Sequence, residues 1–202
     1  MAVASGDVPP FFLRQMLALN DAELSGRIAA VWGSVQAPSA DKAARIARYK
    51  AMLTPEAVRR ADPVNGRRVF ARTCAACHVL FDAGARIGPE LTGSQRANVD
   101  YILENVLDPS AVVADVYRVT LVTLKDGRLV SGVVTRETDA ALTLQSQSEA
   151  VTVPKEEIAE RAKLANSLMP EGLLDRLTPD EVRDLAAYLA SPGQVSLPPG
   201  PK

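Results

Sequence analysis

The chain has 202 residues, 47% of them hydrophobic, and a formal net charge of −1 at pH 7. This length allows one large domain or two small ones with a buried core. The near-zero charge favours neither nucleic acid nor an anionic membrane as a partner, and no apolar run approaches the roughly 20 residues that span a bilayer.

Residues 1–61 are expected to form an N-terminal helical extension. Asn20 and Glu23 have the spacing of a capping box at the start of a helix. Apolar residues then recur on one helical face in two stretches, at Leu24, Ile28 and Val31 and at Ile46, Tyr49 and Leu53. These spacings indicate amphipathic helices.

A further helix is expected from Asp62, and it leads into Cys74-Ala75-Ala76-Cys77-His78. Two cysteines with this spacing can each bond to a vinyl group of haem, and a histidine directly after them can bind the iron. The two cysteines and the one histidine of the whole chain all lie in this motif. The motif therefore predicts one covalently attached haem c, with His78 as a ligand of its iron.

Other interpretations of the cysteine pair stay open. A redox dithiol shares the spacing but gives no reason for the adjacent histidine, and a chance structural pair is the third possibility. A zinc site would need a second pair of ligands, which the chain lacks. Covalent haem is normally attached outside the cytoplasm, so we expect a periplasmic or exported protein. Since the first seven residues lack the features of a signal peptide, the sequence is expected to be a segment of a longer exported protein.

The glycine-rich stretch after the motif is expected to be a loop that supports the histidine. A metal-bound histidine usually donates its other ring N–H to a carbonyl or carboxylate, which fixes the orientation of the ring. The stiff Gly88-Pro89 pair lies shortly after His78, so we expect the Pro89 carbonyl to accept this bond. Arg86 and Arg96 are candidates for pairing with the haem propionates, with solvated surface arginines as the alternative.

Residues 117–161 are expected to form a small antiparallel β insertion. Four short stretches rich in β-branched or apolar residues are separated by polar turns, at 117–124, 129–135, 142–144 and 151–153. Asp126-Gly127 between the first two stretches is a strong hairpin signal. With Gly132 as a point of curvature, the pattern predicts a β-barrel-like sheet, from which we infer no nucleic-acid binding.

From residue 162 the chain is expected to be helical or irregular again, and it offers a second iron ligand. With the only histidine in use, the other axial position must hold Met, Lys, water or nothing. Met169 is the best candidate, because a thioether ligand raises the reduction potential and suits an electron carrier. Pro170 stiffens the backbone that presents the sulfur, and core packing is the alternative role of Met169.

The end of the chain is expected to contain one more helix and a tail. Thr178 and Glu181 form a capping box with Pro179 at the first helical position. Residues 191–202 contain four prolines and two glycines, a composition typical of a disordered tail.

These motifs resemble those of class I cytochromes c, and more narrowly the haem-binding domain with a β insertion found in planctomycetes, verrucomicrobia and acidobacteria. The matching residues are Gly66 and Phe70 before the cysteine motif, Gly88-Pro89-Glu90-Leu91-Thr92-Gly93, Asp108-Pro109-Ser110, Lys125-Asp126-Gly127-Arg128 and Ser167-Leu168-Met169-Pro170. The resemblance implies a mainly α, class I cytochrome c helical fold that wraps one haem. Residues 62–116 and 162–190 would form this domain around the insertion at 117–161.

The resemblance also implies particular contacts. Gly66 and Phe70 would pack against the helix of Tyr188, the Pro89 carbonyl would receive the ring N–H of His78, and Met169 would be the distal iron ligand.

The sequence thus predicts an electron-transfer domain rather than an enzyme. It would relay electrons from a dehydrogenase-type partner or fused domain, with no nucleic-acid partner and no membrane span in this segment. The alternative is a haem-based sensor or gas-binding domain with an open or displaceable sixth position. Peroxidase chemistry is disfavoured, because no second histidine exists to act as acid and base.

Overall fold

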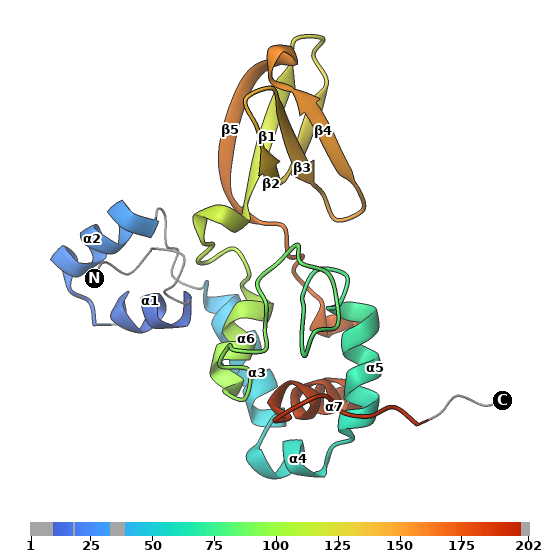
Figure 1. The fold of residues 1–202 in the computed structure, drawn as a ribbon. Helices are drawn as coiled ribbons and strands as arrows, with labels where there is room; N and C mark the ends of the chain where they lie inside the picture. Colours follow the sequence, from blue (N-terminus) through green and yellow to red (C-terminus); the bar gives the residue numbers. More distant parts are fainter. Residues whose placement is uncertain (1–9, 18, 33–38, 199–202) are drawn as a thin grey trace. The chain divides into compact units, whose positions relative to one another are not determined.

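The structure is a computed structural model that describes residues 10–17, 19–32 and 39–198. Within these ranges it contains seven α-helices and one five-stranded antiparallel sheet (Figure 1). The predicted mainly α, class I cytochrome c fold is therefore wrong, because a substantial sheet accompanies the helices. No helix in the described ranges is both long and apolar enough to cross a membrane.

The chain divides into two compact units. The first comprises residues 1–37 and 109–170, and the second comprises residues 38–108 and 171–202. Residues 1–61, expected to be one extension, are thus divided between the two units.

The sheet of the first unit has the strand order β4-β3-β2-β1-β5, with each strand antiparallel to its neighbours. The strands are β1 (Arg118–Leu124), β2 (Leu129–Glu137), β3 (Ala141–Gln145), β4 (Ala150–Pro154) and β5 (Ile158–Ser167). Strands β1 to β4 confirm the four stretches predicted from the sequence. The predicted hairpin is present as well, with Gly127 at a φ of 88° in the turn between β1 and β2.

The sheet curls around an apolar core. One face buries Val122, Leu124, Leu142, Leu144 and Val153. Glu137 at the end of β2 pairs with Arg161 of β5 at 3.1 Å, across the intervening strand β1. At Gly132 an added Cβ would lie 2.5 Å from the carbonyl oxygen of Gln145, and the glycine therefore permits the close approach of β3.

The fifth strand was not predicted. Residues 159 to 166 of β5 are all exposed, so the strand shows none of the alternation between apolar and polar residues that marks a half-buried strand. Its register is instead set by β1, from Arg118 opposite Ser167 to Leu124 opposite Ile158.

The first unit also contains two helices and two short 3₁₀ turns. These are α1 (Pro10–Leu17), α2 (Ala22–Trp32), η2 (Asp115–Tyr117) and η3 (Lys155–Glu157). Leu13 of α1, Ile28 of α2 and Val112 form a small separate core. The helix predicted around Ile28 is confirmed by α2. Asp21 rather than Asn20 supplies its cap, accepting from the N–H of Leu24 at 2.9 Å, and Val31, expected on the apolar face, is exposed.

The second unit is helical in its described residues. Its elements are α3 (Ala40–Met52), α4 (Pro55–Arg60), α5 (Pro63–Thr73), α6 (Val99–Leu107), η4 (Leu174–Arg176) and α7 (Pro179–Ala190). The predicted helix starts are confirmed: the Asp62 carboxylate accepts from the N–H of Val64 at 2.8 Å, and Thr178 and Glu181 form a capping box. All these elements contribute residues to one apolar core, in which Leu174 of η4 is buried.

Helices α5 and α7 cross at Gly66, where the sequence predicted a close contact. An added Cβ on Gly66 would lie 1.9 Å from the carbonyl oxygen of Asp184 and 2.8 Å from the Cβ of Tyr188. One turn along α5, the ring of Phe70 meets that of Tyr188 edge to face, with the centroids 5.5 Å apart. The expected packing of Gly66 and Phe70 against the Tyr188 helix is confirmed.

The segment after α7 is held against the helices. The hydroxyl of Tyr188 donates to Gln194 at 2.9 Å, and Arg67 of α5 donates to the carbonyl oxygen of Val195 at 2.5 Å. Residues 191–198 therefore make specific contacts, in contrast to the disordered tail expected from their prolines. Residues 199–202 of that tail lie outside the described residues.

Candidate cofactor site at Cys74, Cys77 and His78

The cysteine motif continues from the last turn of α5. Cys74 is the C-cap residue of this helix, and its N–H donates to the carbonyl oxygen of Phe70 at 2.8 Å. The carbonyl oxygen of Cys74 then accepts from Cys77 at 3.0 Å and from His78 at 2.9 Å. These bonds wind the motif into a tight turn, with both half-buried cysteines present as free thiols.

The thiols lie in an apolar setting. Burial raises the pKa of the Cys74 thiol to about 12, with a smaller contribution from Cys77, and burial also raises the pKa of Cys77. Redox dithiols instead depend on a lowered thiol pKa, because the thiolate is the nucleophile. The surroundings of these cysteines are therefore the opposite of those that favour a reactive dithiol.

The ring of His78 is oriented by a backbone carbonyl. Its Nδ1 atom lies 2.8 Å from the carbonyl oxygen of Pro89, as the sequence predicted. Because a carbonyl can only accept, Nδ1 carries the proton and Nε2 keeps a lone pair. Burial lowers the pKa of His78, against the opposing effect of the Pro89 bond, and so favours the neutral ring that metals bind.

The loop after the motif folds back onto it. The N–H of Ala85 donates to the carbonyl oxygen of Ala75 at 2.9 Å, and that of Gly88 donates to Cys77 at 2.8 Å. An added Cβ on Gly88 would lie 2.6 Å from Cε1 of the His78 ring. The glycine therefore lets the backbone pass directly against the ring and brings the neighbouring Pro89 carbonyl within reach of it.

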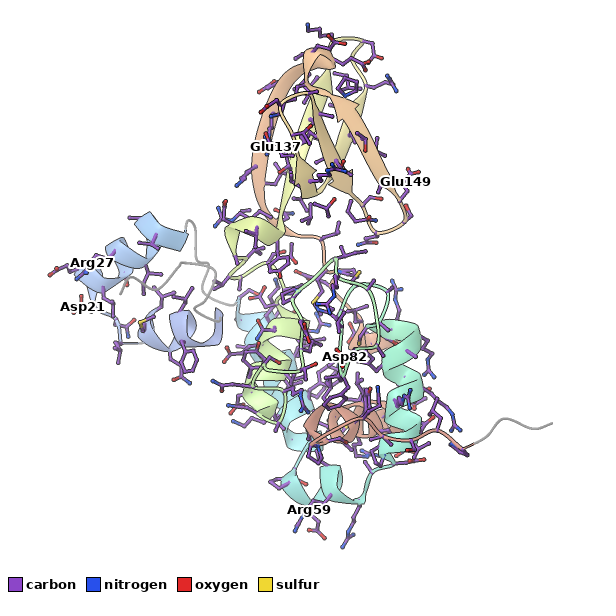
Figure 2. All side chains as sticks on the ribbon, in the orientation of Figure 1. Asp21, Arg27, Arg59, Asp82, Glu137 and Glu149 are labelled. Carbon is purple, nitrogen blue, oxygen red and sulfur yellow. The ribbon has the colours of Figure 1, made fainter. Side chains whose placement is uncertain are left out.

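A strained turn in this loop contributes a side chain that the sequence did not single out. Phe81 and Asp82 have φ angles of 51° and 62°, and reciprocal bonds of 3.0 and 3.1 Å between Leu80 and Ala83 close the turn (Asp82 is labelled in Figure 2). Such angles are unfavourable for residues other than glycine. The turn places the Phe81 ring 6.2 Å from that of Tyr188. Asp is common in turns, but nothing in the sequence marks the bulky Phe81 for a left-handed conformation, so its place beside Tyr188 could not be predicted.

The two arginines proposed for the propionates have protein partners. Arg96 donates to the carbonyl oxygens of Leu189, at 2.5 Å, and Ser191, and its guanidinium lies 4.6 Å from the centre of the Phe81 ring. It therefore caps the C-terminal end of α7, where a cation is favourable. Arg86 forms an exposed ion pair with Glu90 at 3.1 Å.

Met169 belongs to the first unit. Its N–H donates to the hydroxyl of Ser167 at 3.1 Å. Its role as an iron ligand stays a prediction from the sequence.

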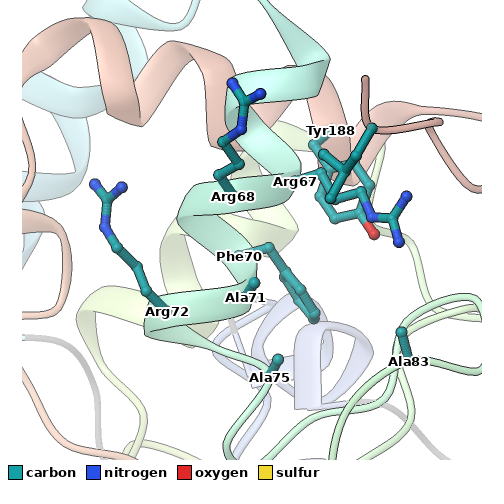
Figure 3. Close-up of a pocket in the computed structure, with 9 residues that line it drawn as sticks. Arg67, Arg68, Phe70, Ala71, Arg72, Ala75, Ala83 and Tyr188 are labelled. Atoms are coloured by element: carbon teal, nitrogen blue, oxygen red, sulfur yellow. The ribbon is translucent and has the colours of Figure 1, made fainter. Parts of the chain in front are cut away.

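An apolar depression of about 460 Å³ lies beside the motif (Figure 3). It is lined by six apolar or aromatic residues and three arginines: Phe70, Ala71, Ala75, Ala83, Tyr188 and Leu197, with Arg67, Arg68 and Arg72. His78 does not line this depression, so it is distinct from the space beside the histidine ring.

No protein-family model matches the sequence, and no curated protein matches it significantly. The function is therefore inferred from the residues of the site.

Proposed function

We propose that this chain is a monohaem c-type cytochrome domain that transfers electrons. Haem c would be attached through Cys74 and Cys77, with His78 and Met169 as the axial ligands of its iron. The observation that carries the proposal is the bond from Nδ1 of His78 to the Pro89 carbonyl, directly after two free thiols.

The residues at the site fit this group. The His78 tautomer leaves Nε2 as a metal-binding atom. Neither cysteine is used in a disulfide, so both sulfurs are available for thioether bonds. Cys74, Ala75, Phe81 and Leu91 all pack against the apolar core of the second unit, which gives the attachment site a low-dielectric side.

When bound, haem would supply a centre that gains and loses one electron. The protein's own residues set the conditions for that change. The Pro89 carbonyl fixes the His78 ring and makes Nε2 a stronger ligand, while the thioether of Met169 favours the reduced iron and raises the potential. Electrons would come from a dehydrogenase-type partner or a fused domain in an exported or periplasmic setting.

The test is the absorption spectrum of the 202-residue chain exported together with haem-maturation machinery. We expect covalently bound haem with a low-spin spectrum and the weak far-red band of a methionine–iron bond in the oxidised state. The double variant Cys74→Ala/Cys77→Ala is the control, and it should lose covalent haem. Wild-type protein without haem would refute the proposal and leave the dithiol interpretation. High-spin haem that binds carbon monoxide readily would favour the sensor instead.

A further inference from the structure

Side chains of helix α3 bind the segment Glu171–Asp175, which directly follows Met169-Pro170; these contacts are called the grip below. Lys42, Arg45 and Tyr49 are spaced three and then four residues apart, so they lie on one face of the helix. The side chain of Lys42 bonds to Glu171 at 2.8 Å, and those of Arg45 and Tyr49 bond to Asp175 at 2.5 and 2.8 Å. One helical face thus binds both acidic residues of this short segment.

The grip is anchored in the core of the second unit. Tyr49 is 5% exposed and belongs to the main apolar cluster, with only its hydroxyl directed to Asp175. Lys42 also bonds to the buried Asp108 at 2.5 Å. Tyr49 and Lys42 are therefore themselves fixed by contacts within the second unit. Hydrogen bonds between charged groups are stronger than those between neutral groups.

Asp108 and Glu171 directly flank residues 109–170 of the first unit, so a single lysine contacts the chain just before and just after this stretch. Leu174 is buried in the core just after this point. The segment from Glu171 to Asp175 is thus fixed at its start by the Lys42–Glu171 ion pair and near its end by the burial of Leu174.

We propose that Lys42, Arg45 and Tyr49 are positioning residues for the sixth iron ligand. The inference rests on the proposed function and adds a role for α3, which the sequence assigned only to a helical extension. Met169 is two residues before Glu171, and consecutive Cα atoms are about 3.8 Å apart, so fixing Glu171 confines the Met169 backbone to within about 8 Å of it. Confinement raises the effective concentration of the sulfur at the iron and lowers the entropy lost on binding.

The test uses the haem-loaded 202-residue protein and the double variant Glu171→Gln/Tyr49→Phe. This variant removes one charge and one hydroxyl from the grip but keeps the Lys42–Asp108 pair and the tyrosine ring in the core. Lys50→Gln is the matched control, because Lys50 lies on the same helix but pairs with Asp100, at 2.8 Å. Two quantities are measured: the carbon monoxide association rate of the reduced protein and the hydrogen exchange of residues 168–177.

In the double variant we expect carbon monoxide to bind about ten-fold faster, a weaker far-red band and faster exchange in residues 168–177. Haem attachment should be unchanged in all three proteins, and Lys50→Gln should behave as the wild type. Equal carbon monoxide rates in the double variant and the control would overturn the positioning role even if haem is bound with methionine ligation. Haem without the far-red band in the wild type would refute Met169 itself, and absent haem would refute the proposed function.

Discussion

The contact at Gly66 gives the sharpest test of the helix crossing beside the cysteine motif. In Gly66→Ala the new Cβ would lie 1.9 Å from the carbonyl oxygen and 2.5 Å from the carbonyl carbon of Asp184. Ordinary contacts need about 3.5 Å, so α7 would have to move by about 1.5 Å. Backbone atoms inside a helix cannot move singly, and the helix must shift as a whole.

The size of the effect follows from three contributions. Overpacking costs about 1–3 kcal/mol, and separating the Phe70 and Tyr188 rings costs about 1 kcal/mol more. Alanine regains about 1 kcal/mol of helix propensity over glycine. We therefore expect a net destabilisation of about 2 kcal/mol, which corresponds to roughly 30-fold faster hydrogen exchange where α5 and α7 open together.

Hydrogen exchange of peptides from α5 and α7 is the assay, because it reports on the second unit alone. Gly26→Ala is the control, since Gly26 lies inside α2 and an added Cβ there meets no atom within 4 Å. That variant should be stabilised by up to about 1 kcal/mol. If hydrogen exchange in α5 and α7 were as slow in Gly66→Ala as in the wild type, the close-contact argument would be wrong.

Three further predictions concern Gly88 in the loop after the cysteine motif, Arg96 at the end of α7, and Asp175, which α3 binds. Gly88→Ala should tilt the histidine ring away from its carbonyl partner and lower the reduction potential or the fraction of low-spin haem, as measured by redox titration with optical detection; an unchanged potential and spectrum would contradict the packing at Gly88. Urea titration should show that Arg96→Ala lowers the free energy of unfolding by about 1–2 kcal/mol, because two carbonyls at the end of α7 lose a charged donor. In the same titration Arg86→Ala, which removes an exposed ion pair, should lower it by less than about 1 kcal/mol. The hydrogen bond from Tyr49, followed by the nearby arginines, holds the pKa of Asp175 below its ordinary value of 3.8. Its stabilising effect is therefore complete above pH 3.8 and lost as the pH falls through the lower folded-state pKa, and Asp175→Asn should reduce that part of the acid dependence of unfolding.

Local patterns of the sequence determined most of the helices and strands and the short-range contacts of the site. The cysteine motif, the capping residues at Asp62 and Thr178 and the Asp-Gly hairpin each depend on residues a few positions apart. Such signals act through short-range sterics and hydrogen bonds, so they can be read without the fold. The Pro89 acceptor was predictable for the same reason, since it lies in the loop that follows His78.

The fold class could not be read in this way. Strand β5 has ten residues, and residues 159–166 in it are all exposed, so the sequence carries no strand pattern there; the strand forms by pairing with the edge of β1. The cysteine motif favoured a mainly α fold with only a small β insertion at 117–161, whereas a five-stranded sheet makes up much of the first unit.

Only the tertiary structure revealed the partners of side chains that are far apart in the sequence. Arg96 meets the end of α7, and the face of α3 meets Glu171 and Asp175. A charged surface side chain can adopt many solvated conformations, and its partner depends on which groups the packing of the core brings close to it. The sequence thus determined which short-range contacts form around His78, and the packing of the second unit decided which distant side chains meet.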